Sequence, residues 1–445
     1  MPYVHTTFSQ LKAALLARLG DSVFWTDDTA IYSEVGSYLQ EALRVWAAAA
    51  HFWKDRVPLS LRTNVAWYDL RVEINALAYT VSDRQVLSEI QYHFLEPLNQ
   101  TGWSGSDQFT LDEIVAAIER RRNQFLDETS AVLAYGVLPV SPPPAEGRFE
   151  LPANFGPPVI DIRRLCWISL AGLHNVLWRD DEMSVQAFSQ ILQTNPDTPN
   201  VYSISTTAPL KVQLFPAPND KGYLELLAVQ NGAPLDVVAG VSLGVPDNLA
   251  WVVKYGAMAD LLGKDGPARD PERATYCERR WREGVELAKL YPQVLLCTVT
   301  GRTIIPTSVR DLDAFSPGWQ DRTPAIPEAM GLTGGMVAFS APPDTAYNAT
   351  LDVLMPAPIP STGAGMLQLG PEELGVILDY AQHVAMFKQG GPEFMETVRQ
   401  YENLVRLAAQ HNEKLPASSA LAAIMRDREM QEDKRRPPST TAEKT

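Results

Sequence analysis

An internal repeat constrains the fold of this chain more than any other feature of its sequence. Residues 246–290 and 371–415 align without a gap at a constant offset (371 − 246 = 125). Eight aligned positions are identical, where average composition gives about three. The identities include a starting proline, a tyrosine and a Gly-Pro dipeptide in each copy: Pro246 and Pro371, Tyr255 and Tyr380, Gly266-Pro267 and Gly391-Pro392. A starting proline and two helical stretches separated by a Gly-Pro break predict a helical hairpin that occurs twice.

The repeat favours a structural role over a catalytic one. Repeated modules pack against their neighbours and build extended surfaces. We expect Tyr255 and Tyr380 to lie in the cores of the two hairpins, and the prolines and Gly-Pro pairs to fix the helix ends.

Length and composition indicate an ordinary folded protein. A chain of 445 residues predicts about three domains, and 45% hydrophobic with 20% charged residues supports a sizeable core. The sequence holds no run of 18 apolar residues, so we expect no membrane span, and no secretory signal is visible. The three cysteines, Cys166, Cys277 and Cys297, are far apart and predict reduced thiols in a cytoplasm.

The formal net charge of −15 argues against sequence-reading DNA binding, because an acidic protein gains no attraction from counterion release. Acidity is compatible with a surface past which nucleic acid slides without sticking. Solubility alone is the plainer explanation of the charge, and we favour it.

The periodicity of apolar residues predicts an α+β chain with five parts. Residues 1–137 are expected to form a helical domain with an extended arm around 57–70, followed by a proline-rich linker at 138–158. A β-rich domain with the first hairpin, 246–290, follows at 159–299. Residues 300–416 are predicted as an irregular stretch, then a second strand and the hairpin 371–415; residues 417–445 form a polar tail.

No motif for nucleotide binding, zinc binding or nucleophilic catalysis is present, so no catalytic, cofactor-binding or metal-binding residue is assigned. Several weaker patterns have plainer explanations: Asp27-Asp28 and Asp180-Asp181-Glu182 as helix caps, Cys166 near His174 as a buried thiol, Trp25, Trp46 and Trp53 as core, Gly363-Ala364-Gly365 as a loop, and His411 beside Glu413 as an incidental pair. Active sites also assemble residues from distant positions, so an enzyme with such a site stays an alternative.

One ordered set of segments resembles the neck or adaptor proteins of tailed phages, including the tail tubular protein A group. The segments are Asp161–Ile168, Gln186–Ser189, Pro199–Tyr202, Leu214–Pro218, Leu224–Leu226, Ala233–Leu235, Val245–Leu249 and Tyr255–Leu262. The segments Phe24–Asp28 and Tyr38–Leu43 are also similar to the N-terminal helix of phage virion adaptors. The resemblance covers about two-thirds of the chain and leaves the region from Thr300 onward without a counterpart.

The resemblance implies a virion structural protein that is assembled in the host cytoplasm and is not an enzyme. It implies a homo-oligomeric ring, commonly a dodecamer, beneath the portal protein. Such a ring joins the portal to the tail tube or nozzle proteins and lets genomic DNA pass without sequence-specific binding. No cofactor and no membrane are implied. Residues 417–445 would then be an arm that a partner orders, and deleting them should weaken attachment to the portal.

Two alternative functions also fit the sequence. One is a different virion part, such as a baseplate or tail-hub component, which only the assembled particle distinguishes from an adaptor. The other is a cytoplasmic hydrolase with an acidic site, which paired carboxylates with raised pKa values in one deep cleft would favour.

Overall fold

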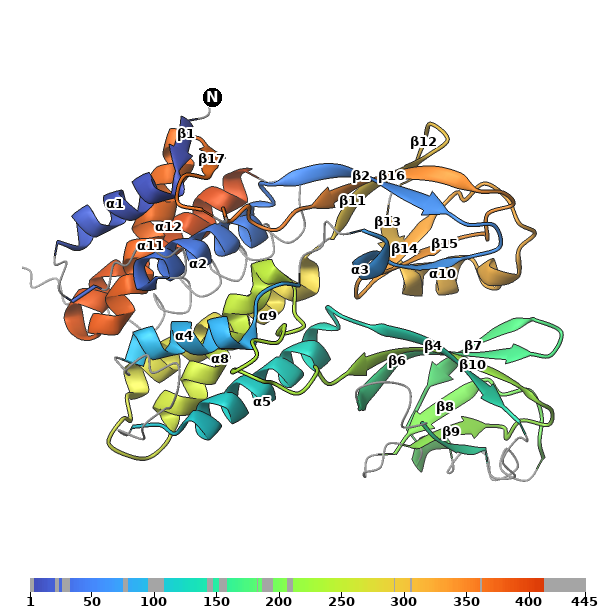
Figure 1. The fold of residues 1–445 in the computed structure, drawn as a ribbon. Helices are drawn as coiled ribbons and strands as arrows, with labels where there is room; N and C mark the ends of the chain where they lie inside the picture. The colour runs from blue at the N-terminus through green and yellow to red at the C-terminus, as the bar shows by residue number, and fades with distance from the viewer. Residues whose placement is uncertain are drawn as a thin grey trace, which may run out of the picture.

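The computed structural model has an α+β fold, with a body of helices on one side and two β-sheet regions on the other (Figure 1). It describes residues 4–20, 24–25, 33–74, 79–94, 108–141, 147–151, 158–181, 183–185, 195–205, 211–291, 293–304, 306–360 and 362–411. Within these ranges, no helix is long and apolar enough to cross a bilayer.

The helical body consists of two groups of four helices. In the first group, α2 (Glu34–Ala50) packs on α11 (Pro371–Gln389) and α12 (Gly391–His411), and α1 (Phe8–Leu19) packs on α2 and α11. In the second, α5 (Leu111–Thr129) packs on α8 (Ala250–Gly263) and α9 (Pro271–Leu290), and α4 (Asp83–Phe94) packs on α5 and α8. The hairpins α8–α9 and α11–α12 are the two halves of the sequence repeat, so the predicted helical hairpins are confirmed.

The remaining helices of the two groups also correspond. Thr7 and Ser82 begin α1 and α4 in the same way, because each hydroxyl accepts a hydrogen bond from the backbone N–H of a glutamine three residues on. The helices α2 and α5 both end at a left-handed residue, His51 (φ 47°) and Ser130 (φ 50°), and a strand follows each within a few residues.

The strands extend this correspondence into the sheets. Strand β2 (Lys54–Leu61) pairs antiparallel with β16 (Tyr347–Leu354), and β4 (Ala134–Val140) pairs antiparallel with β10 (Gly222–Gln230). The hairpin β11 (Val294–Val299) and β12 (Arg302–Ile304) lies against β16, as β6 (Val159–Ser169) and β7 (His174–Arg179) lie against β10.

The register of these strands matches at the level of single residues. Tyr347 pairs with Leu61 and Gly222 pairs with Val140, and the two central strands are offset by the same 125 residues (347 − 222) as the hairpins. A β-bulge interrupts both ladders at the same place. In the β11–β16 ladder it lies between Val294 and Leu296 of β11, and in the β6–β10 ladder it lies between Leu227 and Ala228 of β10. We infer from this match that the chain contains two copies of one unit.

The second copy is inserted into the first. The inserted copy runs through α4, α5, β4 to β10, α8 and α9. The split copy consists of the elements on either side: α1, α2 and β2 before the insertion, and β11 to β16, α11 and α12 after it. Even the short ladder that precedes the helices recurs. Strand β1 (Val4–Thr7) pairs with β17 (Met366–Leu369), and an isolated bridge joins Ser82 to Ser242.

The two copies stack in the same orientation (Figure 1). In the split copy, α1 lies on the outer side of its group and α2 faces the inserted copy; in the inserted copy, α4 faces the split copy and α5 lies outermost. Because equivalent helices occupy opposite positions, the contact between copies joins two different surfaces of the unit. All 17 residues of α2 are buried as a result, since the helix has neighbours on every side.

Additional elements complete the sheets. The inserted copy has a seven-stranded sheet in the order β4-β10-β6-β7-β8-β9-β5, with β5 at Arg148–Glu150, β8 at Val201–Ile204 and β9 at Lys211–Phe215. The split copy adds a second four-stranded sheet, β13-β14-β15-β3, of Pro306–Ser308, Met330–Thr333, Met336–Phe339 and Trp67–Asp69. Helix α10 (Val309–Phe315) packs on β13 and β14, and the turn η3 (Trp319–Asp321) follows it.

Two segments differ from the sequence prediction. The predicted linker at 138–158 contains the end of β4 and all of β5, because an edge strand such as β4 tolerates a proline at Pro139. The predicted irregular stretch after Thr300 contains β12 to β15 and α10, each too short for its period to stand out. The arm predicted around 57–70 is formed by β2 and β3, both paired within sheets. The predicted tail, 417–445, lies outside the described residues.

Candidate functional site

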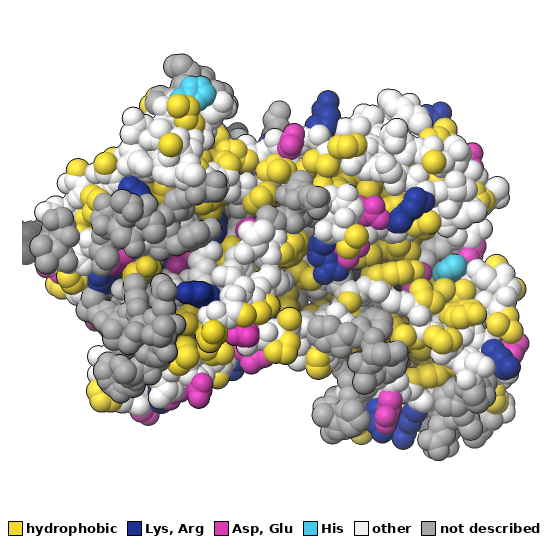
Figure 2. All heavy atoms as spheres, viewed as in Figure 1, with side chains coloured by type: hydrophobic (Ala, Val, Ile, Leu, Met, Phe, Trp, Pro, Cys, Tyr) yellow, Lys and Arg dark blue, Asp and Glu magenta, His cyan; other side chains and the backbone are white. Residues whose placement is uncertain are grey.

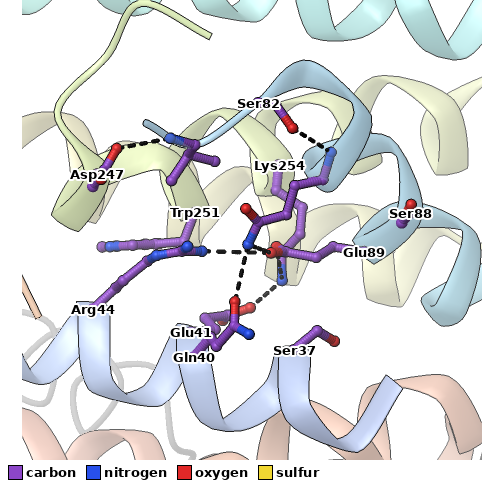
Figure 3. Close-up of polar contacts among 12 residues, drawn as sticks. Ser37, Gln40, Glu41, Arg44, Ser82, Ser88, Glu89, Asp247, Trp251 and Lys254 are labelled. Carbon is purple, nitrogen blue, oxygen red and sulfur yellow. Dashed lines mark hydrogen bonds and ion pairs between the residues drawn. The ribbon is translucent and has the colours of Figure 1, made fainter. Parts of the chain in front are cut away.

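The most unusual group of side chains lies buried where the two copies meet (Figure 3). It contains Gln40, Glu41 and Arg44 from α2, Glu89 from α4 and Lys254 from α8, all labelled in Figure 3, together with Gln85 and His93 of α4. We call this set the junction cluster. Charged side chains are seldom buried unless they are paired, so the partners of each one decide what the cluster does.

Lys254 is the centre of the cluster. Its ammonium group donates to Glu41 Oε2, lies 3.5 Å from Glu89 Oε2 and is 3.4 Å from His93 Nε2. The Lys254 and Glu41 side chains are only 2% and 1% exposed. One lysine therefore joins the α8 helix of the inserted copy to the α2 helix of the split copy.

The other oxygen of Glu41 is shared by the two tyrosines of the sequence repeat. Tyr255 and Tyr380 donate their hydroxyl protons to Glu41 Oε1 over 2.9 and 2.8 Å. Both tyrosines are 0% exposed, which confirms the prediction that they are core residues. Equivalent positions of the two copies thus meet on one carboxylate.

The outer part of the cluster continues the network toward the surface. Arg44 lies 3.5 Å from Glu89 Oε1, and the Gln85 amide donates to Gln40 Oε1 at 3.0 Å and to Glu89 Oε1 at 3.3 Å. Gln40, Arg44 and Gln85 border a cavity of about 570 Å³. Asp247, also on its wall, already accepts hydrogen bonds from the Thr80 hydroxyl and from the backbone of Thr80 and Val81.

The electrostatics of the cluster favour fixed charges. Burial raises the pKa of Glu41, but Lys254, Arg280 and the hydrogen bond from Tyr380 together lower it by more, so the net pKa is below the ordinary value. Burial, together with the charges of Lys254, Arg273 and Lys388, holds the pKa of His93 well below its usual range. His93 therefore stays neutral, and its Nε2 can accept a hydrogen bond from the Lys254 ammonium group.

Arg280 of α9 adds a second cation beside the cluster. Its guanidinium lies over the Tyr401 ring at 3.6 Å and donates to the Tyr380 hydroxyl at 2.5 Å. The rings of Trp251 and Tyr255 lie 4.7 and 5.0 Å away. Burial lowers the pKa of Arg280, but the surrounding tyrosines raise it by a larger amount. The net pKa is above the ordinary value, so the side chain remains charged.

This arrangement binds the two copies together and offers little to a substrate. The ammonium group is enclosed, and each carboxylate already accepts two or more hydrogen bonds or ion pairs. A buried network of this kind, with defined partners, specifies which surfaces meet and in which register. We interpret the junction cluster as an assembly site within the chain.

The residues singled out from the sequence lie elsewhere and are not brought together. Burial raises the pKa of the Cys166 thiol to about 12, so it is a poor nucleophile. His174 contacts Asp321, with 2.6 Å between Nδ1 and Oδ1, and not Cys166. The acidic cluster at Asp181 caps a helical turn through the backbone N–H groups of Met183 and Ser184.

The other sequence patterns are also structural where they are described. Carbonyl oxygens of Gly363 and Gly365 accept hydrogen bonds from the backbone N–H groups of Ser9 and Phe8, so this loop holds the start of α1. Trp25 and Trp46 are buried in the core, as predicted, whereas Trp53 is only partly buried and packs against the core from outside. His411 contacts Glu373. Asp27-Asp28, Glu182 and Glu413 lie outside the described residues.

Sequence reasoning missed the junction cluster, although a signal was present. Glu41 and Arg44 interrupt the helical stretch of α2, and Lys254 interrupts the apolar stretch of α8. A charged residue on an otherwise apolar helix predicts a buried partner on another helix. The partner could not be named, because the pairing depends on how the two copies stack.

The described residues contain no group of three or more histidine, cysteine or acidic side chains placed to hold a metal ion. Comparison with known proteins adds no identity: no family model matches the chain, and no curated protein matches it.

Proposed function

We propose that this protein is a structural subunit of a tailed-phage particle: a head-to-tail adaptor that forms a ring between the portal and the tail and lets DNA pass. It acts through assembly and not through catalysis. In this proposal its partners are copies of itself, the portal protein and the tail tube or nozzle proteins.

The observation that carries the proposal is the stacking of two copies of one unit in the same orientation. A contact between two different surfaces of a unit leaves one surface of each kind unused at the ends of the stack. Repetition of such a contact produces closed rings or open filaments, whereas a contact between identical surfaces stops at a dimer. The resemblance to phage adaptors, which form rings, points the same way.

The charge distribution also supports this role. On the face drawn in Figure 2, basic and acidic side chains are interspersed among the coloured residues and form no basic track. With a net charge of −15, such a surface would not retain DNA that moves past it.

The hydrolase alternative finds no support in the carboxyl groups. Every carboxyl group with a shifted pKa among the described residues is shifted downward, because arginine, lysine or hydrogen-bond donors lie beside it: Glu41, Glu113, Asp260, Asp270, Asp311 and Asp352. A carboxylic acid that donates a proton near neutral pH needs a raised pKa instead.

The mass of the purified protein in solution, with negative-stain images of the same fraction, tests the proposal. We expect rings, either from the protein alone or after addition of the portal protein encoded in the same genome. A protein that stays monomeric and does not bind that portal protein would contradict the adaptor role. Localisation in purified particles by labelling then separates an adaptor from a baseplate component.

A further inference from the structure

We propose that a second copy of this chain docks through the same kind of contact that joins the two copies of the unit within one chain. The outer surface of α5 in one chain would receive the outer surface of α1 and α11 in the next. This inference rests on the assembly proposed above, and it supplies the residues that would make the contact.

The outer surface of α5 corresponds to the surface of α2 that is buried between the copies. The left-handed residues His51 and Ser130 align the two helices, with an offset of 79 residues (130 − 51). The exposed positions of α5 recur every four residues and include Ala116, Arg120 and Gln124. Their counterparts on α2 are Ser37, Glu41 and Val45, all buried. We call Ala116, Arg120 and Gln124 the α5 surface.

The outer surface of α1 corresponds in the same way to the buried surface of α4. The helix starts at Thr7 and Ser82 set an offset of 75 residues (82 − 7). Gln10, Ala14 and Arg18 of α1 therefore match Gln85, Glu89 and His93, the three α4 residues of the junction cluster. We call Gln10, Ala14, Arg18 and the neighbouring Asp379 of α11 the α1 surface.

The packing within each copy supports this alignment. Arg18 of α1 pairs with Asp379 of α11. At the matching positions of the inserted copy, His93 of α4 contacts Lys254 of α8, which is offset from Asp379 by the same 125 residues (379 − 254). The α1 surface is thus the counterpart of the α4–α8 surface that holds the junction cluster.

The charges of the two free surfaces are complementary. Within the chain, the central ion pair joins Glu41 of α2 to Lys254 of α8. Their counterparts are Arg120 on the α5 surface and Asp379 on the α1 surface, so the pair recurs with its signs exchanged. Arg120 and Asp379 are 62% and 47% exposed in the single chain, against 1% and 2% for Glu41 and Lys254.

The neighbouring charges would extend this pair into an alternating row. Arg120 also contacts Asp260 within its own copy, and Asp379 contacts Arg18 within its own. Docking would place these four side chains in the order Arg18, Asp379, Arg120, Asp260, with each charge beside its opposite. Alternation of this kind gives an interface its specificity and register.

Cross-linking between two single-cysteine variants tests the contact. We would prepare Arg120→Cys and Asp379→Cys separately, mix them in equal amounts and add a short bis-maleimide. The three native cysteines are buried, so the introduced thiols are the ones that react. We expect covalent dimers in the mixture and in neither variant alone, because the two surfaces differ.

Three outcomes overturn the inference. Dimers from one variant alone would show a contact between identical surfaces. No cross-link in a mixture whose solution mass shows association, with both thiols labelled by a maleimide dye, would show that the surfaces do not meet. No cross-link after addition of the portal protein, with portal binding intact, would remove this contact and leave the adaptor role standing. Cross-linking without portal binding would keep this contact and contradict the adaptor role.

Charge reversal provides a second readout that does not depend on reagent access. Arg120→Glu and Asp379→Lys should each weaken self-association by about tenfold or more, because like charges would then face each other. The variant carrying both changes restores the opposite charges across the contact and should recover part of the association, since Arg18 and Asp260 then lie beside like charges in their own chains. Arg282→Glu serves as the control, since Arg282 is exposed on α9 outside both surfaces. Equal effects of all variants, or no recovery in the double variant, would contradict the pairing.

Discussion

Lys254 shows how a single residue can couple the two copies of the unit. Its ammonium group lies between the carboxylates of Glu41 and Glu89, which belong to different copies. Removing water from three charged groups costs free energy, and only their mutual attraction and their hydrogen bonds offset it. The arrangement is therefore more sensitive to the loss of one partner than to the replacement of all of them.

Replacing this lysine should be strongly destabilising. In Lys254→Met, Glu41 and Glu89 stay buried without the shared cation, and we expect the free energy of unfolding to fall by about 3–5 kcal/mol. Urea denaturation followed by circular dichroism measures the loss. Lys289→Met is the matched control, since Lys289 is exposed on α9 and pairs with Glu286 one turn away, and it should change stability by less than about 0.5 kcal/mol. A loss below about 1 kcal/mol in Lys254→Met would show that the cluster does not hold the copies together.

His51 gives the protein a pH-dependent stability. Burial and the nearby charge of Lys54 lower the pKa of His51 from 6.5 to about 4. Because the folded state binds this proton less well than the unfolded state, the contribution of His51 is complete above pH 6.5 and is lost as the pH falls toward 4.

Replacing His51 should therefore flatten the dependence on pH. His51→Asn keeps a residue that tolerates the left-handed conformation at the end of α2. Between pH 7.5 and 5, we expect the wild-type protein to lose about 2 kcal/mol more unfolding free energy than the variant. Urea titrations at both pH values measure this difference. Parallel losses in the two proteins would show that His51 does not titrate in this range.

At the scale of elements, the hairpin α8–α9 depends on two glycines at the helix contact. A Cβ atom on Gly284 would lie 2.5 Å from Val252, and one on Gly256 would lie 2.5 Å from Trp281. Contacts this short require the neighbouring side chains to move. The equivalent positions of α11 and α12 are Ala381 and Ala409, so the second hairpin has a methyl group at both positions.

Two glycine substitutions should have opposite effects. Gly284→Ala gains helix propensity but overpacks the contact, and we expect a net loss of about 1–3 kcal/mol in the free energy of unfolding. Gly375→Ala on α11 meets nothing within 4 Å and should gain about 0.5–1 kcal/mol. Thermal and urea unfolding of both variants measures these changes. Equal gains in the two would show that α8 and α9 have room to separate.

The sequence was sufficient to predict these hairpins but not the unit to which they belong. Helical periodicity and the Gly-Pro breaks are local signals, and Tyr255 and Tyr380 kept their identity because both meet Glu41. The equivalent strands β10 and β16 share only Leu226 and Leu351, since a strand pairs through its backbone and many side chains fit the same register. For the same reason the insertion of one copy into the other could not be predicted from the sequence. The junction cluster could not be predicted either, because it forms only where the two copies stack.

At the scale of the whole molecule, a second contact joins the two β-sheet regions. Arg164 of β6 pairs with Glu225 of its own sheet and with Asp313 of α10 in the split copy, at 2.6 and 2.7 Å. Its guanidinium also lies near the rings of Trp67 and Trp319. The copies are thus fastened at the junction cluster and again between the sheets.

Removing the second contact should loosen the sheets and leave the helices joined. We expect Arg164→Met to lose about 3–5 kcal/mol, because Glu225 and Asp313 lose their buried partner. Hydrogen exchange should rise in β3 and α10 and stay unchanged in α2 and α8. Arg56→Met, which removes an exposed pair with Asp352, is the control and should have little effect. A uniform rise in exchange across the chain would show that the two contacts are not separable.

The nesting of one copy inside the other also determines the order in which the parts are made. The ribosome completes the inserted copy, through α9, while the split copy still lacks β11 to β16 and its hairpin α11–α12. The inserted copy can therefore fold first, with Lys254 and Tyr255 bound to Glu41 of the earlier helix α2, and present Arg280 to Tyr380 and Tyr401 of the helices that follow. The last hairpin to be synthesised, α11–α12, then docks on a surface that has already folded. The split copy is completed around the folded inserted copy.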